Sequence, residues 1–438
     1  MRAHEEDERR PRHHEHPGRN AARAQASRFG SGGFLGQCFG HNHARIVPQA
    51  GIITEEVAHT RIERGHTMTY LGEGTPKLGF GLMRLPNLEP GKPDIEQIKQ
   101  MVDVFMERGF TYFDTARAYG TSEAAIKEAL VDRYPRESYQ LASKNAAWLM
   151  TPDEQTAKAH LQTSLETTGA GYFDYYLIHN LGSNRTQVFD KWNLWEWAVE
   201  QKEAGLIKHL GASFHDTADV VAGLLDAHPE IEFAQLQINW ADWDDPFVQA
   251  RQCFEACRER NIPVIIMEPI KGGTLATLPE RVEAILREAN PDKTPAEWAL
   301  QYVASLPGVI TVLSGMSTLE QTEQNTAFMS SIKPLTADEQ AAMERAQEAL
   351  RAMDLIPCTA CNYCTKDCPM NIPIPDILAA MNRETIYEDH EKAAGDYRFG
   401  VMGKGKASDC IQCGQCEGAC PQGISIMEHL EAAVAQFE

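Results

Sequence analysis

The stretch Tyr139-Gln140-Leu141-Ala142-Ser143-Lys144 is a short apolar run with the character of a strand, and residues 152–168 follow it with a helical pattern. A strand followed by a helix is the repeating unit of folds built on a parallel sheet. The same unit recurs eight times between residues 70 and 330. Eight units over about 260 residues match a (β/α)₈ barrel in number and size.

All eight expected strands are short and mainly apolar. They cover residues 77–82, 112–114, 139–144, 175–179, 209–214, 234–238, 264–267 and 310–313. A doubly wound open sheet is the main alternative, but it would not usually need eight units, and its glycine-rich fingerprint after the first strand is missing. The sequence therefore predicts an α/β fold, with a TIM barrel over residues 68–335 and a connecting helix over residues 336–356.

Eight of the 11 cysteines lie between Cys358 and Cys420. They form two runs with the spacing C-x₂-C-x₂-C-x₃-C-P, which begin at Cys358 and Cys410. Clustered cysteines in a chain without an export signal indicate metal ligation rather than disulfides. Bacterial ferredoxins use this spacing to hold two [4Fe–4S] clusters, and the fourth cysteine of each run binds the other cluster.

The spacing thus assigns four cysteines to each cluster. The first cluster is expected to bind Cys358, Cys361, Cys364 and Cys420, and the second Cys368, Cys410, Cys413 and Cys416. A structural zinc site is the alternative, although zinc does not call for two matching quartets that each end in proline. Residues 357–438 are therefore expected to form a helix-rich dicluster ferredoxin-type domain. The remaining pair, Cys253 and Cys257, is expected to be buried in the core.

Residues 1–67 differ from the rest of the chain, because they contain eight of the 15 histidines and show no sustained helical or strand pattern. We expect this segment to be disordered, since it buries too little apolar surface to offset its ordering entropy. A His-rich metal-binding tail is one interpretation. The favoured one is that Met68 is the true start of the protein, because the histidines lack ligand spacing.

Ionisable side chains end three successive strands of the expected barrel. Asp114, Lys144 and His179 each follow an apolar run, and Tyr119 lies in the loop after Asp114. Barrel enzymes gather their catalytic groups at the carboxyl ends of the strands. Polar residues also cap such strands in a purely structural role, so the pattern alone leaves both interpretations open. Trp148 and other tryptophans near strand ends either line an aromatic pocket or pack between helices.

These segments resemble the aldo-keto reductase family. Residues 113–120 (FDTARAYG) are similar to the family's signature, and residues 79–86 (GFGLMRLP) resemble its first strand. Lys144 and His179 complete the family's tetrad in the right order. The resemblance covers residues 68–330, and the cysteine runs beyond it make the chain similar to the iron–sulfur branch of the family.

The resemblance implies an NAD(P)H-linked oxidoreductase that reduces a carbonyl group. Tyr119 would donate the proton, Lys144 would favour its loss and Asp114 would keep Lys144 charged. His179 would orient the carbonyl oxygen. The positions that correspond to dinucleotide contacts are Ser213, Gln235, Met267, Gly272, Gly315, Ser317, Gln321 and Asn325.

Several of these positions depart from the family pattern. Phe214 stands where many members have Asn, and Met267 takes the position of a usual aromatic residue that stacks on the nicotinamide. Gly315 and Gln321 stand where Lys and Arg usually read the 2′-phosphate of NADP(H). The choice between NADP(H) and NAD(H) therefore stays open.

The formal charge of −21 disfavours binding to nucleic acids or anionic membrane surfaces. No apolar run approaches the roughly 20 residues needed to cross a bilayer. We expect a cytoplasmic protein that acts on a small-molecule carbonyl substrate, with a ferredoxin or another redox protein as a candidate partner.

The two halves of the chain pose a chemical problem, because a hydride carries two electrons and a cluster accepts one. Three hypotheses follow. The barrel reduces carbonyls with NAD(P)H while the clusters are structural or dock a partner; the clusters carry electrons between a ferredoxin and the barrel; or the chain is a cofactor-bound redox sensor. The complete tetrad favours catalysis over sensing.

Overall fold

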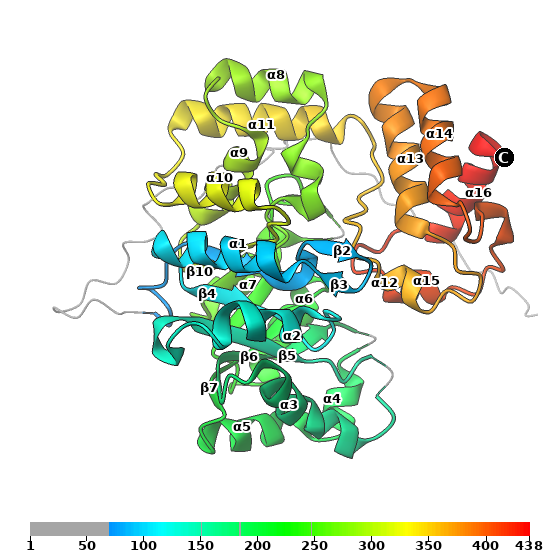
Figure 1. Cartoon of the computed structure of the whole chain (residues 1–438). Helices are drawn as coiled ribbons and strands as arrows, with labels where there is room; N and C mark the ends of the chain where they lie inside the picture. The colour runs from blue at the N-terminus through cyan, green and yellow to red at the C-terminus, as the bar shows by residue number, and fades with distance from the viewer. Residues whose placement is uncertain (1–69, 150, 184, 247) are drawn as a thin grey trace, which may run out of the picture. The chain divides into compact units, whose positions relative to one another are not determined.

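The computed structural model describes residues 70–149, 151–183, 185–246 and 248–438. Eight parallel strands close into a barrel in the order β1-β10-β9-β8-β7-β6-β5-β4, and β4 pairs with β1 to complete the ring (Figure 1). The strands are β1 (Leu78–Gly81), β4 (Tyr112–Asp114), β5 (Gln140–Asn145), β6 (Phe173–Leu181), β7 (Ile207–Phe214), β8 (Phe233–Gln237), β9 (Val264–Met267) and β10 (Val309–Ser314). The predicted (β/α)₈ barrel is confirmed.

Helices follow the barrel strands and form the outer layer. They are α1 (Ile95–Glu107), α2 (Ser122–Ile126), α3 (Glu154–Thr168), α4 (Gln187–Lys191), α5 (Leu194–Glu203), α6 (Ala218–Ala227), α7 (Ala250–Glu259), α8 (Glu280–Ala289), α9 (Pro295–Ala304) and α10 (Leu319–Met329). A π-helix over Lys127–Val131 continues α2, and short 3-10 turns cover Leu82–Arg84, Arg136–Ser138 and Lys271–Ala276. The sequence analysis missed α9 and the hairpin of β2 (Asn87–Glu89) and β3 (Lys92–Pro93).

Side chains of the barrel strands alternate between the barrel interior and the layer of helices. Inside, Tyr175 packs against Tyr112 and Phe233, with ring centres 5.1 Å apart in both contacts. Phe113 and Tyr176, each one position further along its strand, belong to the core between strands and helices instead. The interior is therefore a packed plug. Inward-facing residues two positions beyond the plug lie at the carboxyl end of the barrel.

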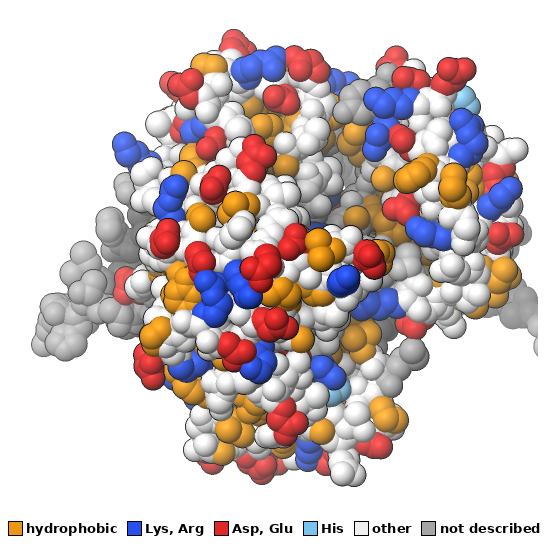
Figure 2. Space-filling model, in the orientation of Figure 1, with side chains coloured by type: hydrophobic (Ala, Val, Ile, Leu, Met, Phe, Trp, Pro, Cys, Tyr) orange, Lys and Arg blue, Asp and Glu red, His pale blue; other side chains and the backbone are white. Residues whose placement is uncertain are grey.

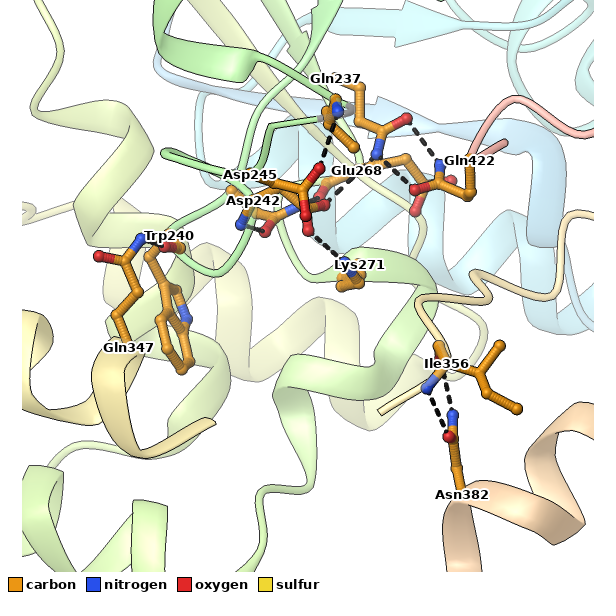
Figure 3. Close-up of polar contacts among 12 residues, drawn as sticks. Gln237, Trp240, Asp242, Asp245, Glu268, Lys271, Gln347, Ile356, Asn382 and Gln422 are labelled. Atoms are coloured by element: carbon orange, nitrogen blue, oxygen red, sulfur yellow. Dashed lines mark hydrogen bonds and ion pairs between the residues drawn. The ribbon is translucent and has the colours of Figure 1, made fainter. Parts of the chain in front are cut away.

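The helix α11 (Ala337–Arg351) leads from the barrel to the cysteine domain and lies within the range expected for a connecting helix. It begins with a capping box, in which the side chains of Thr336 and Glu339 each accept a backbone N–H. Gln347 on this helix donates to the backbone carbonyl of Trp240, as Figure 3 shows. These contacts fix the helix against the barrel.

The cysteine domain contains two similar halves and has its own apolar core. Its elements are α12 (Tyr363–Lys366), α13 (Ile374–Tyr387), α14 (His390–Gly400), a 3-10 turn (Ala407–Asp409), α15 (Gln415–Ala419) and α16 (Ile426–Phe437). In each half the cysteine run contains a short helix, α12 or α15, and a longer helix, α13 or α16, follows the run. Ile377, Leu378 and Leu430 fill the core between the longer helices.

The surface agrees with a charged, acidic chain. Acidic and basic side chains are interspersed on the face drawn in Figure 2. In the described part of the chain, no helix is both long and apolar enough to cross a membrane. Cys253 and Cys257 are buried on α7, which confirms their expected place in the core. The predicted disorder of residues 1–67 concerns a segment outside the described residues.

The first cysteine run packs directly on the loop that follows β9. A Cβ atom added at Gly272 would lie 2.2 Å from the carbonyl oxygen of Thr359, and the φ of Gly272 is 65°. Arg84 Nη2 donates to the same carbonyl at 2.8 Å. The close approach that requires a glycine here therefore comes from the chain's own cysteine loop, although Gly272 was expected from the sequence as a dinucleotide contact.

Gly272→Ala is expected to lower the free energy of unfolding by about 1–3 kcal/mol, because the new Cβ overlaps Thr359 at a positive φ. Thermal unfolding of anaerobically purified protein measures this effect. Gly223→Ala on α6 is the control, since its Cβ meets nothing within 4 Å, and it should raise stability by about 0.5–1 kcal/mol. An unchanged midpoint for Gly272→Ala would contradict the tight contact.

Candidate active site and cluster sites

A buried ion pair between Lys144 and Asp114 lies at the barrel mouth. Lys144 Nζ donates to Asp114 Oδ1 at 2.6 Å and to the carbonyl oxygen of Thr115 at 2.8 Å. The two side chains are 0% and 3% exposed. Burial raises the pKa of Asp114 and lowers the pKa of Lys144, and the charge of each partner opposes that shift. The two groups therefore depend on each other for their charged forms.

Tyr119 and His179 lie beside this pair. Lys144 Nζ is 4.8 Å from the centre of the Tyr119 ring. The Tyr119 ring packs edge-on against the His179 ring, with their centres 5.9 Å apart. The four side chains come from β4, the loop after it, β5 and β6. The structure thus brings together the four residues that the sequence analysis singled out as a tetrad.

Burial controls the protonation of Tyr119 and His179. It raises the pKa of the Tyr119 phenol well above its ordinary value; the Asp114 charge acts in the same direction and the Arg84 charge opposes it. Burial, together with the Lys144 charge, lowers the pKa of His179 well below its ordinary value. At neutral pH the phenol keeps its proton and the imidazole is uncharged.

A cavity of about 630 Å³ opens above these residues. Asp114, Tyr119 and His179 border it on the barrel side. The cysteine domain borders it as well, through Thr359, Cys361, Tyr363, Pro421 and Gln422. A cavity of this size suits a small-molecule or cofactor site. Both parts of the chain therefore contribute to the walls of one site.

Three of the expected dinucleotide positions meet at the barrel mouth. Ser213 Oγ accepts the N–H of Asn180 at 2.8 Å, and Gln235 Nε2 donates to Met267 Sδ at 3.7 Å. Gln235 Oε1 is buried and finds no hydrogen-bond partner among the described residues. A buried amide oxygen without a partner calls for a ligand that donates to it, and the carboxamide of a nicotinamide fits that need.

Four of the other expected positions follow β10 and border the same cavity, as Gly272 after β9 also does. The N–H of Ser317 donates to Gln321 Oε1 at 2.8 Å, so it is engaged within the chain. Asn325 Nδ2 donates to Ser314 Oγ at 3.2 Å. Gly315 also borders the cavity. These residues are therefore placed beside a ligand, although the Ser317 N–H would have to exchange its partner to contact a phosphate.

The cysteines surround two small cavities. Cys358, Cys361, Cys364 and Cys420 line the first, and Cys368, Cys410, Cys413 and Cys416 line the second. These are the quartets that the spacing assigns. Within the described ranges no three His, Cys, Asp or Glu side chains converge closely enough to hold one metal ion. Thiols spread around a cavity fit a four-iron cluster, in which each thiolate binds a different iron, better than a tetrahedral zinc site.

The two cysteine loops share a backbone conformation that directs N–H groups at sulfur. The N–H of Ala360 donates to Cys358 Sγ at 3.5 Å, and the N–H of Gln412 donates to Cys410 Sγ at 3.4 Å. Ala360 and Gln412 have positive φ angles of 51° and 54°. Hydrogen bonds to ligand sulfurs stabilise their negative charge and tune the reduction potential of a cluster. The repetition indicates that both loops are built for the same kind of group.

The sequence analysis missed the residues that join the two domains. The side-chain amides of Gln237 and Gln422 exchange hydrogen bonds of 3.0 and 2.8 Å, as Figure 3 shows. Tyr363 lies inside the first cysteine run and Gln422 lies just after the second, so the motif indicated that both are close to a cluster site. No feature of the motif indicated that it faces the barrel.

The tryptophans divide between the two roles left open by the sequence. Trp148 packs edge-on against His179 and against Tyr363 of the cysteine domain, with ring centres 5.8 and 5.4 Å apart. Trp192 and Trp195 are buried in the core between strands and helices. Trp148 is thus the one of these three that contacts the candidate site.

Comparison with known proteins gives two matches along the chain. Residues 77–348, more than half of the chain, match the model of the aldo/keto reductase family, and residues 357–425 match the model of the 4Fe-4S dicluster domain. The second match covers all eight candidate cysteines.

Individual relatives match the barrel. An aldo-keto reductase of Mycolicibacterium vanbaalenii is 30% identical over 282 residues, which are 63% of this chain and 90% of that protein. Protein REDOX 2 of Catharanthus roseus is 25% identical over 57% of this chain and 77% of that protein. Among solved structures, the aldo-keto reductase AKR11C1 from Bacillus halodurans superposes with a TM-score of 0.50 and 24% identity, and the match covers 62% of this chain and 91% of that chain.

Cysteine variants test the crossed assignment of the two quartets. Cys368→Ser should remove the second cluster, as Cys410→Ser does, although Cys368 lies in the first run, because the fourth cysteine of a run serves the other cluster. Each variant should fall from about eight to about four irons per chain, measured by iron analysis and EPR of anaerobically purified protein. Cys257→Ser in the barrel core is the control and should keep all the iron. A Cys368→Ser spectrum that matched Cys361→Ser would contradict the assignment.

Proposed function

Because the chain belongs to the aldo/keto reductase family, we propose that it uses NAD(P)H to reduce an aldehyde or ketone at the barrel mouth. One observation carries the proposal: the Tyr119 phenol, the His179 imidazole and the Asp114 carboxylate line one cavity, and Asp114 is paired with the buried ammonium of Lys144. Reduction of a carbonyl requires a proton donor and a group that orients the oxygen, and these four side chains supply both.

Tyr119 donates the proton to the carbonyl oxygen. Its raised pKa keeps the proton in place until negative charge develops on the substrate oxygen. The ammonium of Lys144, 4.8 Å from the ring centre, stabilises the phenolate that remains. Asp114 holds that ammonium through the 2.6 Å hydrogen bond. The proton transfer is thus supported by charges that need little rearrangement.

His179 orients the substrate. Tyr119 packs on one edge of the imidazole and Trp148 is a second ring neighbour, so the ring is held in one direction. Because its pKa lies well below the ordinary value, His179 is uncharged and does not compete with Tyr119 as the acid. A neutral imidazole N–H is a suitable hydrogen-bond donor to the carbonyl oxygen.

When bound, the dinucleotide supplies the hydride. Ser213 and Gln235 would hold its carboxamide, Met267 would contact its ring, and Gly315, Ser317, Gln321 and Asn325 would hold the distant half. Arg84 is the only Lys or Arg that borders the cavity within the described residues. The proposal therefore covers both NADPH and NADH as the hydride donor.

The eight cysteines would hold two [4Fe–4S] clusters, and such clusters supply one-electron transfer or structural support when bound. The proposed carbonyl reduction needs only the structural role of the clusters, in which they would hold the cysteine loops that border the cavity. The cytoplasmic location expected from the sequence stays a prediction.

Tyr119→Phe tests the proposal. It removes the proton donor and keeps the ring, so turnover of a carbonyl panel with NADPH or NADH should fall by about 10²–10⁴-fold. Dinucleotide binding, followed by the fluorescence of the reduced nicotinamide, should persist. Tyr302→Phe is the matched control, since Tyr302 is a buried phenol on α9. Undiminished turnover in Tyr119→Phe would refute the assigned role.

A series of ring contacts favours a second function, in which the cysteine domain feeds electrons to the barrel. Tyr363 lies between Cys361 and Cys364, and its ring contacts Trp148, which contacts His179. The series ends at Tyr119. Each carbonyl would take up two electrons, delivered singly by a ferredoxin-type protein, and two protons, one from Tyr119 and one from solvent.

Trp148→Leu separates this second function from the first. Protein reduced with dithionite, without NAD(P)H, is mixed with the carbonyl panel, and the EPR signal of the reduced clusters is followed. Electron feeding predicts that substrate removes the signal and that Trp148→Leu slows its loss, whereas Trp195→Leu in the helix layer does not. A signal that persists with substrate in every protein would exclude electron feeding.

A further inference from the structure

Arg84 borders the cavity at the end of the 3-10 turn Leu82–Arg84. Its Nη2 donates to the carbonyl oxygen of Thr359 at 2.8 Å, and its Nη1 lies 3.7 Å from Glu268 Oε1. The second distance is too long for a hydrogen bond. The side chain is 29% exposed. The guanidinium therefore keeps N–H donors that a ligand in the cavity can use.

Among the described residues, no other Lys or Arg side chain borders this cavity. Lys144 is engaged with Asp114 behind the cavity wall. His179 and His215 also border the cavity, but burial lowers the pKa of His179 well below its ordinary value and that of His215 to about 3. Among the described residues at the cavity, Arg84 is thus the only side chain with a full positive charge.

Glu268 is the carboxyl group nearest to the Arg84 guanidinium, but its surroundings disfavour the negative charge that would neutralise Arg84. Burial raises the pKa of its carboxyl group, which favours the neutral form. Its Oε2 is buried and has no hydrogen-bond partner among the described residues, and its φ is 56°. Positive φ in a residue with a long side chain is strained and is frequent at functional sites. Figure 3 shows Glu268 next to Gln237 and Gln422. A neutral Glu268 carboxyl group can donate a hydrogen bond, as the Arg84 guanidinium can. The two groups together therefore suit a ligand with a negatively charged oxygen.

We propose that Arg84 binds an oxyanion of the ligand where the barrel meets the cysteine domain, and that this oxyanion is a carboxylate of the substrate. The substrate class is then an oxo acid, an aldehyde or ketone that also carries a carboxylate. This inference rests on the proposed carbonyl reduction and extends it to a substrate class.

A phosphate of the dinucleotide could also supply the oxyanion that Arg84 binds. The direction in which the Arg84 guanidinium points favours a carboxylate of the substrate instead. The backbone carbonyl of Arg84 accepts from Ser317 Oγ at 2.8 Å, on the side of the expected dinucleotide positions that follow β10. The guanidinium instead reaches Thr359, in the cysteine loop that also supplies Cys361 and Tyr363 to the cavity wall. The charge therefore lies on the cysteine-domain side of the cavity, next to the space above Tyr119.

Matched substrates test the proposal with the full chain, purified anaerobically with its clusters. The probes are 4-formylbenzoate and its methyl ester, which present the same aldehyde with and without the charge. The wild-type protein should favour the acid in kcat/KM. Arg84→Met should lower the acid-to-ester ratio of kcat/KM by about 10–100-fold, as expected for the loss of a charge-assisted pair. Arg84→Lys should recover part of the ratio, and the exposed control Arg287→Met should not change it.

Binding measurements distinguish the sources and do not need turnover. Calorimetric titration with benzoate should give binding to the wild-type protein and a weaker affinity for Arg84→Met, with an unchanged Kd for NADPH in both. An unchanged acid-to-ester ratio combined with weaker NADPH binding in Arg84→Met would assign Arg84 to a dinucleotide phosphate and overturn the proposal. If neither aldehyde is turned over, the proposed reduction of these carbonyls fails, and benzoate binding alone decides the carboxylate site. Equal benzoate affinities in the two proteins would overturn that site.

Discussion

Closure of the eight parallel strands is the constraint on which the rest of the structure depends. In a closed barrel every second side chain of a strand points inward. The rings of Tyr112, Tyr175 and Phe233 fill the interior, so the next inward positions toward the carboxyl end are the first with room for a ligand. Asp114 follows Tyr112 by two residues, and Lys144 follows Ala142, another interior residue, by two residues. Three of the four tetrad side chains, those of Asp114, Lys144 and His179, are therefore held by the sheet itself.

This placement has an energetic cost that indicates function. An ionised group buried in a protein costs several kcal/mol unless a partner compensates it, and apolar residues of similar volume are often as stable or more stable. The pair of Lys144 and Asp114 is almost wholly buried, and its visible compensation is one mutual hydrogen bond and one to Thr115. Packing alone gives no reason to keep such a pair at the mouth of a barrel. In the proposed function the pair holds an ammonium 4.8 Å from the centre of the Tyr119 ring.

The parts of the site that the sequence could predict are those governed by local rules. The strand ends marked Asp114, Lys144 and His179, and the family resemblance added Tyr119 and their roles. Cysteine spacing within each run defined the two quartets that line separate cavities. The contact between Gln237 and Gln422 joins residues 185 positions apart and follows no period. The packing of Thr359 on Gly272 is equally nonlocal, and a glycine in a loop after a barrel strand looks the same whether a phosphate or a backbone approaches it. The sequence therefore predicted each half of the site and not the way the halves meet.

The meeting of the halves also bears on the mismatch between a two-electron hydride and one-electron clusters. Thr359 lies between Cys358 and Cys361, and its carbonyl contacts both Arg84 and Gly272. Metal binding contributes free energy to the folding of the segment that supplies the ligands. A cluster bound by these cysteines would thus order the loop that holds Arg84 and forms one wall of the cavity. On this argument the clusters can be required for substrate binding without any electron passing between them and the substrate, and the two chemistries need no common intermediate.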